Sequence, residues 1–249
     1  MLSQRPIIVS FSGIDGAGKS TQIDALCQHL QGLGFRPRIY QFWDDVVVLS
    51  GFRERIAHKA FKGDQGVGSP ENPLVRRDKN VKSWYVTAFR LFLYVLDAVS
   101  LRGAVFKRRL RSTKDGIDAV IFDRYLYDEL ANLPFQGGPA LQSWLMRLYL
   151  RMVILVAPSP DLALVVDADP EAAYLRKPEY PLEFVRANRD AFLSLSRIVP
   201  EITVVPPASA AKQSQIIMSL VNPKCQLRAT PNAQLPPEIV SRQANTGHL

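Results

Sequence analysis

A glycine-rich stretch near the start of the chain carries the clearest chemical signal in the sequence. Residues 13–20, GIDGAGKS, match the pattern G-x-x-x-x-G-K-[ST] at every fixed position. In this pattern the glycines let successive backbone N–H groups converge on an anion, and the following helix adds the partial positive charge of its N-terminus. We call residues 13–20 the phosphate loop, because the pattern predicts a site for the phosphates of a nucleotide.

The phosphate loop and the residue after it supply the candidate ATP-binding residues. These are Gly13, Asp15, Gly16, Ala17, Gly18, Lys19, Ser20 and Thr21. Lys19 is also a candidate catalytic residue, because a lysine here reaches the β- and γ-phosphates, and the Ser20 hydroxyl is a candidate ligand of Mg²⁺. The loop therefore predicts ATP and Mg²⁺ as cofactors.

Apolar runs and helical stretches alternate around this loop, as its chemistry requires. Strands are expected at 7–11, 38–42, 119–122, 162–166 and 202–205. Helices are expected at 19–32, 81–111 with a break allowed near Gly103, 140–156, 170–177, 182–197 and 209–221. Several of the apolar runs are continuous, which is typical of parallel strands covered on both faces. The order predicts an α/β fold of the P-loop NTPase type, a five-stranded parallel sheet with helices on both faces.

Composition sets limits on the class of protein. The 249 residues are 47% hydrophobic and 22% charged, which excludes a collagen, a fully disordered chain and a disulfide-stapled miniprotein. Cys27 and Cys225 have no metal-ligand spacing. The N-terminus lacks a signal-peptide pattern, and the most apolar stretch, 84–101, contains Arg90 and Asp97. We expect a cytoplasmic protein with no membrane span.

The formal net charge of +8 comes from two segments. Six cations and no acid lie in residues 102–114, and residues 222–249 hold three cations and one acid. The first segment is either a solvated helix end or a contact for an anionic surface or nucleic acid. Phe106 is the one aromatic residue within it, so nucleic acid is not an expected partner.

Three motifs resemble those of thymidylate kinases. Residues 14–22 (IDGAGKSTQ) resemble the phosphate loop of that family, and residues 122–125 (FDRY) resemble its Asp-Arg-Tyr motif at the end of the third strand. Residues 164–171 (LVVDADPE) resemble its fourth strand and the turn that follows. The resemblance covers residues 7–221 and implies a kinase that transfers the γ-phosphoryl group of ATP to a nucleoside monophosphate.

The resemblance also implies roles for single residues. Asp123 would lie near Mg²⁺, and Arg124 would grip the phosphate of the acceptor as a catalytic residue, since an arginine fork suits phosphate oxygens. Asp15 would face the acceptor and accept a hydrogen bond from a sugar hydroxyl. Two structural alternatives stay open, a local turn cap for Asp15 and a cap of the next turn for Asp123.

A lid is implied at about residues 176–189. Arg176, at the exit of the expected helix after strand four, is the third candidate catalytic residue, matching a lid arginine of the family. Other cations flank the PEYP segment, namely Lys177, Arg186 and Arg189. A solvated helical face is the alternative interpretation of these cations.

The acceptor side departs from the family pattern. The family usually has Arg-Glu-Pro after the second strand, where this chain has residues 41–45 (QFWDD), and Ser12 stands where Glu is common. One helical face in the 81–111 stretch carries polar residues three or four positions apart: Ser83, Thr87, Arg90, Tyr94 and Asp97. We expect this otherwise apolar helix to be buried, with Arg90 and Tyr94 contacting the acceptor. An ion pair between Arg90 and Asp97 is the alternative.

Together these observations predict a kinase domain at 1–221 and a disordered tail at 222–249. The expected partners are ATP, a small phosphate acceptor and, by analogy with the family, a second copy of the chain. Two alternative functions remain open. One is a kinase of the same fold acting on a nucleoside or a sugar-like molecule, and the other is a non-catalytic ATP-binding switch.

Overall fold

The computed structural model describes residues 5–46, 84–131 and 140–229. Five parallel strands form one sheet in the order β2-β3-β1-β4-β5. Their bounds are β1 Ile7–Ser12, β2 Pro37–Gln41, β3 Ala119–Asp123, β4 Leu162–Val166 and β5 Ile202–Val205. This topology confirms the predicted five-stranded parallel sheet.

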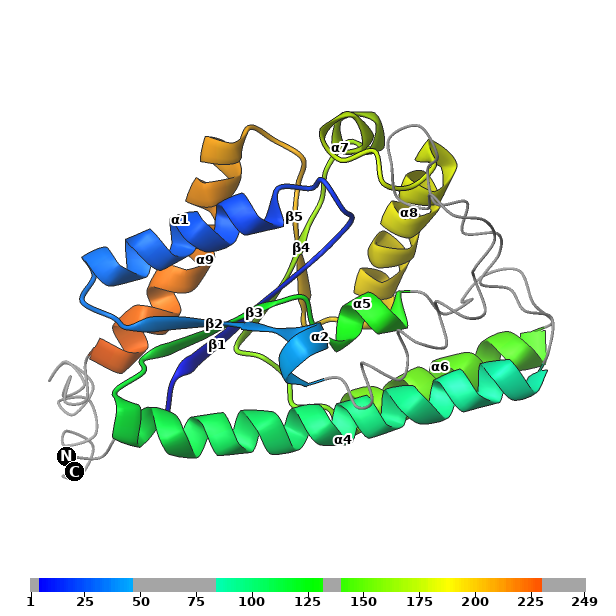
Figure 1. Cartoon of the computed structure of the whole chain (residues 1–249), viewed down its shortest axis with the longest axis horizontal. Coiled ribbons are helices and arrows are strands. Elements are labelled where there is room, and N and C mark those ends of the chain that lie inside the picture. Colours follow the sequence, from blue (N-terminus) through cyan, green and yellow to red (C-terminus); the bar gives the residue numbers. More distant parts are fainter. Residues whose placement is uncertain (1–4, 47–83, 132–139, 230–249) are drawn as a thin grey trace, which may run out of the picture.

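Helices cover both faces of the sheet (Figure 1). The long helices are α1 Lys19–Gly32, α4 Trp84–Asp115, α6 Ala140–Val156, α8 Leu182–Ile198 and α9 Ala210–Ala229. The short ones are α2 Phe42–Asp45, α5 Leu126–Leu130 and α7 Pro170–Arg176. Helices α1 and α9 pack together on one face, and α4 and α6 lie side by side on the other. Every residue of the central strands β1 and β4 is buried, which explains their continuous apolar runs.

The register of the sheet brings the carboxyl ends of three strands to one edge. Asp123 at the end of β3 pairs with Phe11 of β1 and with Gln41 of β2. Ligands of open α/β sheets bind at this edge, where the strand order reverses direction. The loops that leave β1, β2 and β3 therefore meet where a site is expected.

Helix α7 begins at Pro170, where the sequence predicts the start of a helix. Asp169 caps the helix, since its carboxylate accepts a hydrogen bond from the Ala172 N–H at 2.9 Å, and Pro170 occupies the first helical position. The cap fixes where the chain turns after β4. This turn lies directly against the phosphate loop.

Several elements differ from the expectations. Phe42 begins α2 instead of ending β2, and the short helix α5 was not foreseen. Helix α4 runs through Gly103 without a break. Helix α9 continues to Ala229, with Pro223 inside it, so residues 222–229 are helical and not part of a disordered tail. Residues 230–249, the rest of that predicted tail, lie outside the described residues.

The expectation that α4 is buried on all its apolar faces is wrong. Phe92, Val99 and Phe106, seven residues apart and thus on one face, are 57%, 53% and 64% exposed. The basic segment forms the last turns of the same helix, with Arg102 and Lys107 exposed. No helix among the described residues is both long enough and apolar enough to cross a membrane.

Candidate active site

The glycines of the phosphate loop are required by two close approaches of the backbone. Gly13 has φ +136°, and a Cβ at this position would lie 2.5 Å from the Val166 carbonyl oxygen of β4. Gly16 has φ +79°, and its Cβ would lie 2.3 Å from the Ala173 carbonyl oxygen of α7. Any side chain would meet backbone at both positions. The loop is therefore held between the end of β4 and the helix that follows.

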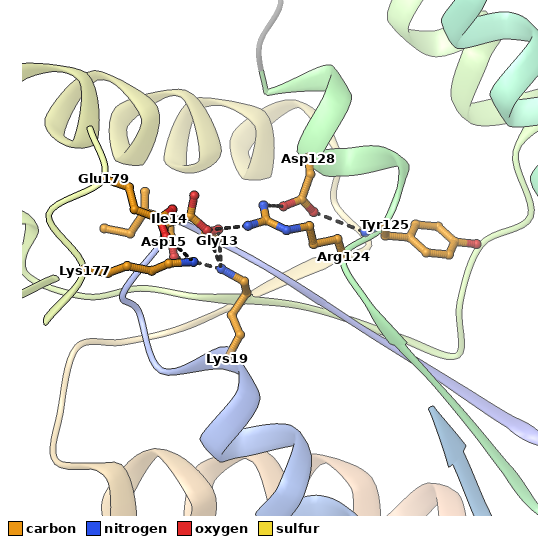
Figure 2. Close-up of polar contacts among 9 residues, drawn as sticks. All are labelled: Gly13, Ile14, Asp15, Lys19, Arg124, Tyr125, Asp128, Lys177 and Glu179. Atoms are coloured by element: carbon orange, nitrogen blue, oxygen red, sulfur yellow. Dashed lines mark hydrogen bonds and ion pairs between the residues drawn. The ribbon is translucent and has the colours of Figure 1, made fainter. Parts of the chain in front are cut away.

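The side chain of Lys19 points into the phosphate loop. Its amine donates hydrogen bonds to the carbonyl oxygens of Gly13 and Ile14, both at 2.9 Å (Figure 2). Burial lowers the pKa of Lys19, and the positive charge of Arg124 lowers it further, against the opposing charges of nearby carboxylates. The amine thus lies at the centre of the loop, where phosphate oxygens are expected.

Arg124 lies immediately beyond β3 in a strained backbone conformation. Its φ of 68° places it in the left-handed region, which residues other than glycine rarely adopt. Its N–H donates to the Phe11 carbonyl oxygen at 2.9 Å, which ties the turn to the end of β1. Such outliers persist only where the surroundings impose them, and they gather at functional sites.

The guanidinium of Arg124 lies between two carboxylates (Figure 2). Its Nη2 donates to Asp15 of the phosphate loop, and its Nη1 donates to Asp128 of α5 at 3.2 Å. Asp15 also lies 3.9 Å from the amine of Lys19. The structure thus brings the loop lysine, the loop carboxylate and the strand-three arginine into one charged cluster.

The charges of this cluster shift the pKa values of its members. Burial raises the pKa of Asp15, but Arg124 and Lys19 outweigh it, so the pKa lies below its usual value. Burial lowers the pKa of Arg124, but Asp128 and Asp15 outweigh it and raise the pKa. Both groups are charged at neutral pH. The side chain of Asp15 contacts Arg124 in place of the local turn cap that was the alternative.

Asp128 is a site residue that the sequence analysis missed. Its second carboxylate oxygen accepts a hydrogen bond from the Tyr125 N–H at 3.2 Å. Burial raises the pKa of Asp128, opposed by Arg124, Lys19 and the Ser12 hydroxyl. Spacing gave no usable signal, because Arg124 lies before α5 in a left-handed conformation, so the helical four-residue rule does not apply to this pair.

Arg176 lies over the phosphate loop. Its Nη1 is 3.9 Å from the position that a Cβ on Gly18 would occupy, and its Nε donates to the Ala172 carbonyl oxygen at 3.0 Å. Among the described residues no carboxylate forms an ion pair with it. Its guanidinium is therefore available to a ligand in the loop.

The other cations of the predicted lid are paired with carboxylates. Arg186 binds Glu171, and Lys177 lies 3.3 Å from Glu179. Arg189 binds Asp167 through two hydrogen bonds of 2.6 and 2.7 Å. Most of the predicted lid, 176–189, belongs to helix α8, and residues 177–181 connect α7 to it. The pairs of Arg186 and Arg189 fasten α8 to α7 and to the end of β4.

Comparison with known proteins agrees with this arrangement. A thymidylate kinase of Dinoroseobacter shibae is 29% identical over 218 residues, covering 82% of this chain and 89% of that protein. A protein of Archaeoglobus fulgidus named "Probable thymidylate kinase" is 27% identical over 210 residues, covering 82% and 87%. The chain is thymidylate kinase-like.

Two further comparisons complete these findings. No protein-family model matches this thymidylate kinase-like chain. A crystal structure of thymidylate kinase from Ehrlichia chaffeensis superposes with a TM-score of 0.48 at 17% identity, covering 88% of this chain and 99% of that one.

The donor set for a metal in the thymidylate kinase-like chain fits Mg²⁺. Ser20, in the first turn of α1, is exposed, and Asp123 is half-buried at the end of β3. The charge of Asp123 raises the pKa of both Lys19 and Arg124, so this carboxylate lies near the cluster. One carboxylate and one hydroxyl suit an ion that takes its remaining ligands from phosphate and water. The described residues contain no cluster of three or more metal-binding side chains.

The segment after β2 of the thymidylate kinase-like chain packs through aromatic residues. After β2 the chain forms α2, closed by a 2.9 Å hydrogen bond from the Gln41 N–H to Asp45. Phe42 is fully buried, with its ring centroid 6.3 Å from that of Tyr125. Ser12, where the family commonly has Glu, is fully buried. A packed helical turn thus stands where the family usually has Arg-Glu-Pro.

The structure gives only limited information on the two residues of α4 that were predicted to contact the acceptor, Arg90 and Tyr94. Tyr94 is 8% exposed and belongs to the hydrophobic core cluster. Arg90 lies in the helix, but its side chain, like all of Ser83, lies outside the described residues. Helix α4 packs against α5, which carries Asp128. The acceptor contacts of Arg90 and Tyr94 stay predictions.

Proposed function

We propose that this chain transfers the γ-phosphoryl group of ATP to a nucleoside monophosphate. The observation that carries the proposal is the cluster of Lys19, Asp15 and Arg124, which joins a phosphate loop to a second cation at the end of β3. Both cations contact the same carboxylate, so they lie close together, and transfer between two nucleotides requires cations that hold the donor and acceptor phosphates side by side. The two thymidylate kinase relatives support the same reaction class.

The residues act mainly by positioning and neutralising charge. Lys19 leaves the two loop carbonyls to contact the β- and γ-phosphates, while Arg124 holds the acceptor phosphate in line with the γ-phosphorus. An oxygen of the acceptor phosphate forms a bond to that phosphorus, the bond to the β,γ-bridging oxygen breaks, and ADP leaves. Ser20 and Asp123 would hold Mg²⁺, which would neutralise charge on the phosphates. Asp15 accepts a hydrogen bond from the acceptor sugar.

The reaction is tested by ADP release over a panel of acceptors. The panel contains deoxynucleoside and ribonucleoside monophosphates, the matching nucleosides, and sugar phosphates. Release that depends on a monophosphate supports the proposal, and release with a nucleoside or a sugar supports the same-fold kinase for another acceptor. Calorimetric ATP binding with no acceptor response would instead support an ATP-binding switch.

Arg176 is proposed to stabilise the charge that develops on the transferred phosphoryl group. Arg176→Ala is expected to lower kcat by roughly 10²-fold with a small change in the KM of ATP, because its guanidinium lies over Gly18. Arg186→Ala is the matched control, since that arginine pairs with Glu171 at the surface. Equal losses in the two variants would contradict the assignment.

Arg90 is proposed to contact the acceptor, together with Tyr94. Arg90→Ala is expected to raise the KM of the acceptor by roughly tenfold and to leave the KM of ATP within about twofold. Initial rates with each substrate varied in turn give both constants. Equal increases in both KM values would favour the alternative, an ion pair with Asp97.

A homodimer is proposed on the face formed by α4 and α6. Helix α6 exposes four apolar side chains on one face: Trp144 (57%), Leu148 (42%), Met152 (53%) and Leu155 (79%). Helix α6 lies beside α4, which carries the exposed residues Phe92, Val99 and Phe106 (Figure 1). Apolar patches of this kind mark interfaces. Light scattering is expected to give a dimer for the wild type and a monomer for Leu155→Glu, and a monomeric wild type would contradict the proposal.

We propose that the catalytic domain extends to Ala229 and that the chain works in the cytoplasm, where ATP is available. The packing of α9 against α1, the helix that begins at Lys19, supports this boundary. Gln22 of α1 donates a hydrogen bond to the Ala210 carbonyl oxygen at 3.1 Å, which adds a polar link between the two helices.

A further inference from the structure

The two carboxylates that bind Arg124 differ in how firmly they are held. The side chain of Asp128 is 4% exposed, whereas that of Asp15 is 21% exposed. Asp128 belongs to helix α5 and also accepts the Tyr125 N–H, so it is tied to the backbone next to Arg124. Asp15 belongs to the phosphate loop, and its carboxylate lies at the open side of the cluster.

Asp128 supports the conformation of Arg124 as well as its charge. One of its oxygens accepts from the guanidinium, and the other accepts from the N–H of the residue that follows Arg124. A single side chain therefore closes the turn in which Arg124 has φ 68°. A buried carboxylate in this arrangement loses much if its cation leaves, since an unpaired buried charge is strongly unfavourable.

Asp15 contacts the two cations that the proposed function assigns to phosphate groups, Lys19 and Arg124. Its carboxylate contacts Arg124 and lies 3.9 Å from the amine of Lys19, so it offsets the charge of both cations. A phosphate monoester carries up to two negative charges and three acceptor oxygens. It can therefore replace a single carboxylate as the partner of these cations.

We propose that Asp128 is the fixed positioning residue of Arg124, and that Asp15 is an exchangeable counter-ion which the acceptor phosphate displaces. This inference rests on the proposed function, because it takes Arg124 to be the residue that binds the acceptor phosphate. Displacement turns Asp15 away from Arg124 and frees its carboxylate to accept from the acceptor sugar. The two acids therefore have opposite effects on phosphate binding.

Calorimetric titration of inorganic phosphate tests the proposal without turnover. The protein is first saturated with a non-hydrolysable ATP analogue and Mg²⁺, so that the phosphate loop is filled. Asp128→Asn is expected to weaken phosphate binding by roughly tenfold or more, since its amide cannot accept from both N–H groups. Asp15→Asn is expected to strengthen it severalfold, since the competing charge is gone.

The outcomes separate the proposal from its alternatives. Changes of the same sign in the two variants would overturn it, and so would a wild type that binds no phosphate. Asp118→Asn is the matched control, because Asp118 also pairs with an arginine, Arg36, at an exposed position. If Asp128→Asn unfolds, Asp128→Ser replaces it, because a serine hydroxyl can still accept the Tyr125 N–H without carrying a charge.

Steady-state kinetics give a second measurement, which would not change selectively if Asp128 had a purely structural role. Asp128→Ser is expected to raise the KM of the nucleotide acceptor by roughly tenfold while the inhibition constant of the matching nucleoside, which lacks the phosphate, stays within about twofold. Equal losses for both would overturn the positioning role. If no monophosphate is an acceptor, the proposed function fails, whereas the phosphate titration still reports on Asp128 and Asp15.

Discussion

Replacing Lys19 by alanine is expected to lower kcat by roughly 10²- to 10³-fold, the largest catalytic effect of any single change in this chain. The amine is buried and already lies at the centre of the phosphate loop, where it donates to the carbonyl oxygens of Gly13 and Ile14. Removing it leaves the transferred phosphoryl group without its nearest cation. Acceptor-dependent ADP release under saturating substrates measures the loss.

Two further variants keep this result interpretable. Lys19→Met retains the length of the side chain without its charge, so a similar loss assigns the effect to the charge and not to a cavity. Lys224→Ala removes an exposed lysine of α9 and is expected to leave kcat unchanged. Circular dichroism and thermal unfolding verify folding. A kcat for Lys19→Met within about threefold of the wild type would contradict the catalytic role.

Replacing Gly16 by alanine is expected to have the largest effect on stability and ATP binding together. The new Cβ would lie 2.3 Å from the Ala173 carbonyl oxygen, and φ is +79°, so a steric clash adds to an unfavourable backbone conformation. We expect a loss of about 3 kcal/mol in the free energy of unfolding. ATP binding is expected to weaken at least roughly tenfold, because the loop and α7 must separate.

The chain provides two matched glycines as controls. Gly34 has φ +82° with open space around its Cβ position, so Gly34→Ala isolates the backbone penalty, about 1 kcal/mol. Gly32 has no positive φ, and no atom lies within 4 Å of the position that its Cβ would occupy. Gly32→Ala is therefore expected to stabilise helix α1 slightly. Urea unfolding gives the free energies and calorimetry gives the ATP affinity. A stability loss for Gly16→Ala no larger than that for Gly34→Ala would rule out the clash.

Much of the fold could be predicted because its elements carry strong local patterns. The buried strands β1 and β4 are continuous apolar runs, and the phosphate loop is a fixed spacing of residues. Boundaries were predicted less well where tertiary packing decides them. Phenylalanine is common in strands, so Phe42 was predicted to end β2. In the structure its ring packs near Tyr125, and the helical turn α2 begins at this residue.

The candidate site could be predicted only in part for a related reason. Lys19 and Arg124 were predicted because each belongs to a recognisable motif. Asp128 was missed because its role depends on helix α5, on burial and on the left-handed turn at Arg124, none of which follows from spacing alone. The pairing of Arg186 and Arg189 with acids likewise depends on how α7 and α8 pack.

The left-handed backbone at Arg124 has a consequence for how this protein changes over generations. A glycine there would relieve the conformational cost, but it would also remove the guanidinium that pairs with the buried carboxylate of Asp128. Stability therefore opposes losing the arginine as long as the aspartate is present. Descendants that keep the fold and abandon the chemistry should accordingly have changed positions 124 and 128 together.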